Sequence, residues 1–129
     1  MTSDPNGPSR PIAGCLDEAT LRQLLDLDDG ATGLMVELFG LFKEDTPSRL
    51  TGLDAALAAG DAQSTAELAH ALKGASGTIG ASRMRGLAQD LEKAGKSGKV
   101  GDTERHRLEE LKTAYAEACA ALDAFLAVG

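Results

Sequence analysis

Residues 65–81 read TAELAHALKGASGTIGA, and this stretch decides the fold. At about 100° of rotation per residue, its apolar and small side chains fall within about 60° of Leu72 on a helical wheel. They are Thr65, Leu68, Ala69, Leu72, Ala75, Ser76 and Ile79. One stripe of this width is typical of a helix that buries a single face against other helices. The pattern predicts a helix over residues 61–79, with Asp61 as its N-cap and Gly80 closing it.

Segments on both sides of this helix carry the same periodicity. The sequence predicts further helices over residues 16–27, 34–59 and 82–94, and from Thr103 onward. Pro47 should bend the long helix without ending it, because the apolar stripe continues beyond the proline. Ser82 and Thr103 are the predicted N-caps of the last two helices, and residues 95–101 are the predicted loop between them. No segment alternates as a strand does, so the predicted fold is all-α: an antiparallel four-helix bundle with an additional short N-terminal helix.

Composition and charge narrow the class of protein. Hydrophobic residues make up 43% of the 129 residues, aromatic residues only 3%, and Trp is absent, which favours helices packed through small and aliphatic side chains. The formal net charge of −7 argues against nucleic acid as a partner, because phosphate backbones are bound by basic surfaces. No apolar run has the length of a membrane span, so no membrane association is expected.

Residues 1–14 differ in composition from the rest of the chain. They are rich in Pro, Gly, Ser and Asn, and they lack the apolar core of a signal peptide. We therefore expect a disordered tail over residues 1–14, a single domain over residues 15–129, and a cytoplasmic protein.

His70 lies on the far side of the predicted helix, about 160° from Leu72, and is expected to face solvent. Its neighbours along that face are small, with Ala66 one turn before it and Gly74 and Gly77 after it. Glycine in a helix interior costs roughly 1 kcal/mol relative to alanine. Two glycines on one exposed face make sense if a second protein must approach the histidine closely, because glycine leaves the backbone uncovered.

Two charged residues lie within one turn of His70. Lys73, three residues later, is close enough for its ammonium to reach an anion on the imidazole. Glu67, three residues earlier, is expected to accept a hydrogen bond from the ring and fix its orientation. A neutral imidazole can attack an activated acyl phosphate without a separate base. The pattern thus favours phosphoryl transfer over a merely solvated histidine, which is our interpretation of His106 among its bulky charged neighbours.

Residues 70–81, HALKGASGTIGA, resemble the signature of histidine-containing phosphotransfer (HPt) domains. That signature reads His, any residue, Leu, Lys, Gly, and then a small stretch ending in Gly-Ala. Residues 42–47, residues 60–61 and residues 86–92 also resemble the family. The resemblance covers nearly all of the predicted helical part. It implies that His70 is the phosphoacceptor, that Lys73 helps to neutralise the phosphoryl group, and that Gly74 gives the partner access.

The resemblance also implies partners. Members of this family pass a phosphoryl group reversibly between their histidine and the aspartate of receiver domains in multistep two-component relays. They are phosphotransfer intermediates without an ATP site of their own, and the receiver domain supplies the magnesium. The expected partners are therefore response-regulator receiver domains and a sensor or hybrid histidine kinase. We expect a monomer that needs no cofactor or metal of its own.

The expected docking surface for a receiver domain surrounds His70. Three small residues form its flat centre, namely Ala66, Gly74 and Gly77. Two arginines form its charged rim, Arg83 and Arg85. Leu41 on the long second helix is a further candidate contact. It has an alternative place beneath the N-terminal helix, beside Leu34 and Leu38.

Three other interpretations fit some of these residues. A histidine kinase dimerisation domain carries an acidic residue directly after its histidine and a proline a few residues on, where this chain has Ala71 and Ala75. A phosphotransfer domain excised from a larger hybrid or chemotaxis-type kinase shares the whole pattern. A helical adaptor without chemistry would bind a partner but would not become phosphorylated.

Overall fold

Helices account for nearly all of residues 15–128, which are the residues that the computed structural model describes. They are α2 (Glu18–Leu27), α3 (Gly33–Ala59), α4 (Ala62–Thr78), α5 (Ser82–Lys96) and α6 (Asp102–Val128). No strand occurs in this range, so the all-α prediction is confirmed. The tail predicted at residues 1–14 lies outside the described residues.

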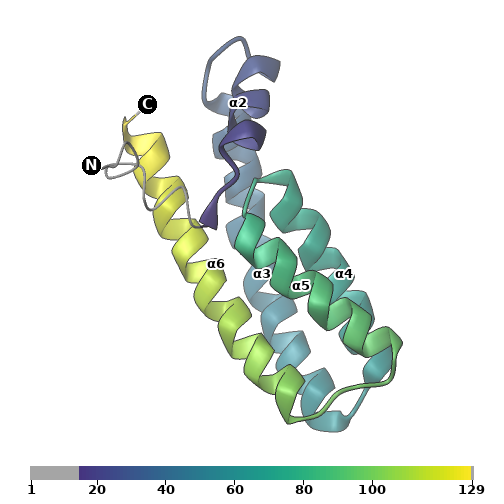
Figure 1. Cartoon of the computed structure of the whole chain (residues 1–129). Coiled ribbons are helices and arrows are strands. Elements are labelled where there is room, and N and C mark those ends of the chain that lie inside the picture. Colours follow the sequence, from purple (N-terminus) through teal and green to yellow (C-terminus); the bar gives the residue numbers. More distant parts are fainter. Residues whose placement is uncertain (1–14, 129) are drawn as a thin grey trace, which may run out of the picture.

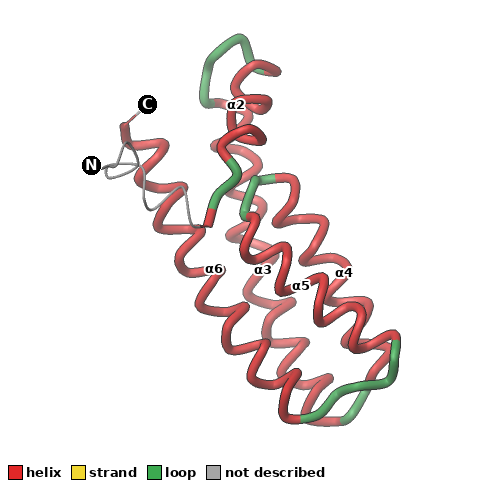
Figure 2. Tube along the Cα trace, in the orientation of Figure 1, coloured by secondary structure: helices red, strands yellow, loops and turns green. Residues whose placement is uncertain are grey.

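The last four helices form an antiparallel bundle, as Figures 1 and 2 show. Each helix packs against its two neighbours in the ring: α3 on α4, α4 on α5, α5 on α6, and α6 back on α3. The short helix α2 lies outside this ring and packs on α3. The prediction of a four-helix bundle with an additional short N-terminal helix is therefore confirmed. None of the helices in residues 15–128 is both long and apolar enough to span a membrane.

The bundle helices differ in length, which decides where α2 can pack. Helices α3 and α6 each have 27 residues, whereas α4 has 17 and α5 has 15. At about 1.5 Å per residue, the long helices extend roughly 15 Å beyond the short ones. At that end α2 covers α3, and its Leu21 and Leu24 are buried.

The apolar stripes predicted from the sequence form the core. On α4, five of the seven stripe residues are buried, and Leu68 and Ala75 are half-buried against the core. On α3, the apolar stripe that continues beyond Pro47 is buried along its length: Met35, Phe39, Phe42, Leu50, Leu53 and Leu57. The helix α3 continues through Pro47 without interruption, as predicted. Gly60 ends it in the left-handed conformation at φ 68°, and the Asp61 side chain caps α4 by accepting a hydrogen bond from the Ser64 N–H.

Several predicted helix ends differ from the structure. The helix α2, predicted from residue 16, begins at Glu18 after its N-cap Asp17. The N-cap of α5 is Ala81, without a side-chain hydrogen bond, so Ser82 is the first helical residue and not the cap. At its other end α5 continues through Gly95 to Lys96, because Gly95 is buried by tertiary packing. The helix α6 begins at Asp102, before the predicted cap Thr103, and the side chain of Glu104 accepts a hydrogen bond of 2.8 Å from the Gly101 N–H.

The residues directly before α2 pack into the core and contact the turn between α4 and α5. Cys15 and Leu16 are buried, and the Asp17 N–H donates to the Gly80 carbonyl at 2.6 Å. Gly80 has a φ of 79°, a backbone conformation that glycine adopts without strain, and it forms the turn between α4 and α5. This contact fixes the turn at the end of the helix that carries His70.

Candidate functional site

His70 projects from the outer face of α4, and its side chain is 70% exposed. Leu72, two residues later, is fully buried on the opposite face. The predicted orientation of the histidine is therefore confirmed. The helix presents the ring to solvent because the stripe centred on Leu72 holds the other face against the core.

A buried carboxylate from the neighbouring helix α5 holds the ring. The His70 Nδ1 atom lies 2.8 Å from Glu92 Oε2, and the Lys73 Nζ atom lies 2.7 Å from Glu92 Oε1. Lys96, one turn after Glu92 on α5, brings its Nζ atom within 3.2 Å of Oε2. The Glu92 side chain is only 5% exposed, whereas Lys73 is 28% and Lys96 68% exposed. One carboxylate thus connects an exposed imidazole with two ammonium groups.

These contacts fix the charge of the carboxylate. The hydrogen bond from Lys73 lowers the pKa of Glu92 most, burial opposes it, and the hydrogen bonds from His70 and Lys96 lower it further, to about 2. Glu92 is therefore ionised at neutral pH and can only accept hydrogen bonds. It follows that Nδ1 of His70 carries the proton, which leaves the Nε2 lone pair available as a nucleophile.

Sequence reasoning missed Glu92, although a signal for it exists. The buried residues of α5 are Met84, Ala88, Leu91, Glu92 and Gly95, so an acidic residue occupies the apolar stripe, four residues after Ala88. Acidic residues are almost never fully buried unless they are paired. A glutamate at such a position therefore indicates a cationic or hydrogen-bond-donating partner, but it does not say which helix supplies that partner.

The expected role of Glu67 in orienting the ring does not match the geometry. Glu67 accepts a hydrogen bond of 3.3 Å from the Gln63 side chain on its own helix, and its side chain is exposed. The ring turns instead toward α5, where Glu92 accepts from Nδ1. A buried carboxylate that is already paired with Lys73 is better ordered than an exposed one, which explains why the ring contacts Glu92.

The small residues around His70 are not equally open. Apart from the backbone of its own helix and its chain neighbours, nothing would lie within 4 Å of a Cβ atom built on Gly74, so the surface beside the histidine is bare there. A Cβ on Gly77 would lie 3.1 Å from Arg85 Cδ, which means that the Arg85 side chain already covers this glycine. Ala66 is half-buried and lies against Gly95 of α5. The predicted flat centre is therefore reduced to Gly74.

The remaining predicted contacts divide into two groups. Arg85 lies beside Gly77 on the same side as the histidine, but Arg83 forms an ion pair of 2.9 Å with Glu117 on α6. Leu41 is 51% exposed and lines a groove between α3 and the last turns of α4. It is therefore not covered by α2. Leu34 and Leu38, in contrast, are half-buried against the core.

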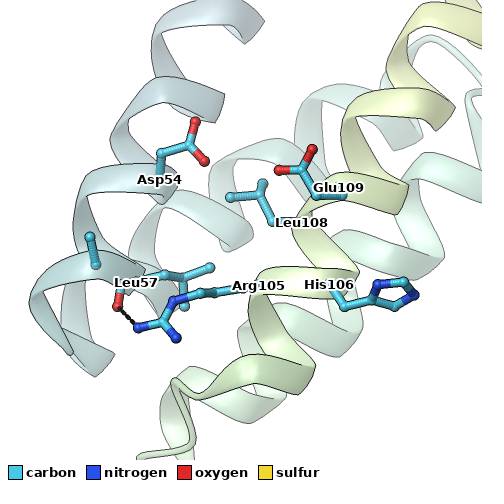
Figure 3. A pocket seen from close by; sticks show the side chains of 7 residues that line it. Asp54, Leu57, Arg105, His106, Leu108 and Glu109 are labelled. Carbon is cyan, nitrogen blue, oxygen red and sulfur yellow. Dashed lines mark hydrogen bonds between the residues drawn. The ribbon is translucent and has the colours of Figure 1, made fainter.

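The second histidine has different surroundings. His106 lines an open pocket between α3 and α6, and Figure 3 shows its ring pointing away from Leu57 and Arg105. The guanidinium of Arg105 donates to the Leu57 carbonyl at 3.4 Å, and Asp54 and Glu109 bind Lys112. No group of three potential metal ligands occurs in the part of the chain that the structure describes.

Comparisons with known proteins agree with this geometry. The family model of the Hpt domain matches residues 37–124. The histidine-containing phosphotransfer protein HptB from Pseudomonas aeruginosa PAO1 is 30% identical, with a TM-score of 0.77 over 86% of this chain and 93% of that one. The histidine-containing phosphotransfer domain of ArcB from Escherichia coli is 26% identical, with a TM-score of 0.77 over 90% and 96%. No curated protein sequence matches significantly. This chain therefore belongs to the Hpt family of histidine-containing phosphotransfer domains.

Proposed function

We propose that His70 is the residue on which this phosphotransfer domain carries its phosphoryl group. The observation that supports the proposal best is that only one of the two ring nitrogens is held by the protein. Its Nδ1 atom is held by an ionised, buried carboxylate, while its side chain is 70% exposed. A fixed tautomer with an accessible Nε2 lone pair is what nucleophilic attack by imidazole requires.

The reaction is a reversible transfer from an aspartyl phosphate of a receiver domain. The Nε2 lone pair attacks phosphorus, a nitrogen–phosphorus bond forms, and the bond from phosphorus to the aspartate oxygen breaks. The aspartate leaves with that electron pair as a carboxylate. The proton on Nδ1 stays in place, and the positive charge that develops on the ring lies 2.8 Å from Glu92. Ordered negative charge at that point stabilises the transition state in both directions.

Lys73 and Lys96 are proposed to neutralise the transferred group. Both ammonium groups contact Glu92 within 3.2 Å or less, so both lie on the side of the site where the ring is held. Glu67 is exposed beside the same face, and its proposed effect is electrostatic repulsion of the phosphoryl group. The magnesium of the reaction belongs to the receiver domain.

The proposed docking surface runs from His70 over Gly74 to the groove beside Leu41, with Arg85 at its rim. Gly74→Gln tests it, because the space around a Cβ atom at this position is open and glutamine has a higher helix propensity than glycine. Transfer should slow at least about tenfold by steric blocking. Gly86→Gln on α5, also open around its Cβ, is the control. Unchanged transfer in Gly74→Gln would remove this surface from the proposal.

The decisive experiment offers the protein a receiver domain already phosphorylated on aspartate. Wild type should become labelled on histidine, His70→Gln should not, and the matched control His106→Gln should behave as wild type. If binding survives in wild type but no label ever appears, the helical adaptor is the correct function. A label that remains in His70→Gln would assign the wrong residue.

We also propose that the domain works as a monomer with receiver domains and a sensor or hybrid kinase as partners. Hpt domains act with such partners in phosphorelays. Light scattering coupled to size exclusion checks the monomer, for which a molecular mass near 13.3 kDa is expected. The cytoplasmic location and the domain limits 15–129 stay predictions, as does the alternative of a domain within a larger kinase.

A further inference from the structure

The backbones of helices α4 and α5 come close together at Gly95. Gly95 of α5 is buried there, and a Cβ atom built on it would lie 2.7 Å from the Ala66 nitrogen and 3.0 Å from the Ala66 Cα. The same Cβ would lie 2.9 Å from the Ala62 carbonyl oxygen. All three are backbone atoms of α4, so they cannot turn aside as the end of a flexible side chain could. The two helices can approach this closely only because residue 95 has no side chain.

This contact lies one helical turn from the functional site on both helices. Gly95 follows Glu92 by three residues, and Ala66 precedes His70 by four, which is the neighbour spacing along a helix face. Because the two helices are antiparallel, the Gly95–Ala66 contact and the Glu92–His70 contact are consecutive steps along one interface. The distance between the helices at the first contact therefore constrains the second.

We propose that Gly95 is a positioning residue for phosphotransfer, because it sets the helix separation at which Glu92 reaches Nδ1 of His70. The inference rests on the proposed function of His70. Gly95 touches neither the ring nor a partner and acts through Glu92. Its consequence is the tautomer of His70: the proton stays on Nδ1, and the nucleophile is Nε2.

A methyl group at residue 95 should disturb this arrangement in a defined way. The helices must separate by several tenths of an ångström to relieve the backbone clash. The hydrogen bond from Nδ1 to Glu92 then lengthens from 2.8 Å, and such bonds weaken steeply as distance and angle deteriorate. The ring is then free to exchange its proton between the two nitrogens and to rotate.

The test compares Gly95→Ala with Gly86→Ala by ¹⁵N NMR of the imidazole and by transfer from a phosphorylated receiver domain. Gly86 is on the same helix, exposed, and open around its Cβ. Gly95→Ala should lower the fraction of the Nδ1–H tautomer and slow transfer about tenfold, while Gly86→Ala matches wild type. A folded Gly95→Ala with the wild-type tautomer would overturn the inference.

Two variants of Glu92 complete the design. In a Glu92→Gln background, adding Gly95→Ala should change the transfer rate little, because the carboxylate through which Gly95 acts is gone. A further tenfold loss there would contradict the inference. If Gly95→Ala fails to fold, Glu92→Asp decides instead. Its shorter carboxylate should lose the tautomer preference if helix separation limits the contact, and a retained preference would overturn the inference.

The tautomer is measured on the free protein without any receiver domain. If His70 never accepts a phosphoryl group, the proposed function is wrong. The tautomer measurement would still test the role of Gly95 independently. Conversely, normal transfer with a wild-type tautomer in Gly95→Ala would remove Gly95 alone.

Discussion

The two carboxylate oxygens of Glu92 accept from three donor groups, whose side chains differ in their exposure to solvent. Lys73 is 28% exposed and binds Oε1 alone, whereas Lys96 is 68% exposed and shares Oε2 with His70. A buried charge needs its partners, while an exposed pair contributes little because water and salt screen it. Lys73 should therefore contribute more to the stability of the fold than Lys96, although both are proposed to neutralise the phosphoryl group.

Lys73→Ala is expected to lower both stability and phosphohistidine yield. It leaves Oε1 of a 95% buried carboxylate without its ammonium, which should destabilise the fold by about 1–3 kcal/mol. Lys96→Ala should change stability by less than about 0.5 kcal/mol. Urea unfolding and the lifetime of phosphohistidine at low and high salt measure the two effects. Equal stabilities of the two variants would show that Glu92 does not depend on Lys73.

The low pKa of Glu92 predicts how the stability of the folded protein changes as the solution becomes acidic. Lys73, His70 and Lys96 hold the pKa near 2 in the folded protein, against an ordinary value of 4.5. Between those values the unfolded chain binds the extra proton, so the stability that Glu92 contributes is present above about pH 4.5 and declines toward pH 2. Glu92→Gln should flatten that part of the stability curve. Urea midpoints measured from pH 6 down to about pH 2.5 would contradict this if both proteins lose stability equally.

The sequence predicts the phosphoacceptor candidate better than its surroundings. The position of His70 follows from periodicity alone, since a ring opposite a buried leucine must face outward. The partner of Nδ1 could not be predicted in the same way. Which edge of α4 contacts α5, and at what register, depends on the order of helices in the bundle, so a same-helix neighbour, Glu67, was the natural but wrong choice.

At the scale of helices, α3 carries an internal defect next to its proline. Thr46 is fully buried, and among the described residues its hydroxyl oxygen has no hydrogen-bond partner. Leaving a buried hydroxyl unsatisfied costs roughly 1–3 kcal/mol. Helix α4 provides the contrast, because the equally buried Thr65 donates its hydroxyl to the Asp61 carbonyl at 2.8 Å.

Thr46→Val should therefore raise the free energy of unfolding by about 1 kcal/mol, since it removes the unsatisfied hydroxyl and keeps the shape of the side chain. Thr65→Val should lower the free energy of unfolding by about 1 kcal/mol, because it removes a satisfied bond. Chemical denaturation of both variants checks the difference in sign. If both lose stability alike, the hydroxyl of Thr46 has a favourable role.

Helix ends show which information is local and which is not. Gly60 and Asp61 form the predicted junction because left-handed glycine and a capping aspartate act within a few residues. Gly95 looked like the start of a loop, yet it is helical because its missing side chain serves the packing on α4. A glycine required by a neighbouring helix and one required by a turn look identical in a single sequence.

At the scale of the whole molecule, the bundle follows from four long amphipathic segments joined by short connections, which leaves an antiparallel arrangement as the simplest solution. The relation of α2 to the bundle is less obvious from the sequence. The Hpt family model matches residues 37–124, so α2 lies outside the matched range. Nevertheless, Leu16, Leu21 and Leu24 belong to the same buried cluster as the bundle helices. The N-terminal helix is thus part of one core.

Leu21→Ala tests whether α2 unfolds together with the bundle. Leu21 is fully buried, so the substitution should lower the free energy of unfolding by about 2–4 kcal/mol. The control is Leu27→Ala on the same helix, where the side chain is 76% exposed and little change is expected. Far-UV circular dichroism in urea should show a single transition for both variants. An unchanged midpoint in Leu21→Ala, or an early separate phase in wild type, would mean that α2 is an independent appendage.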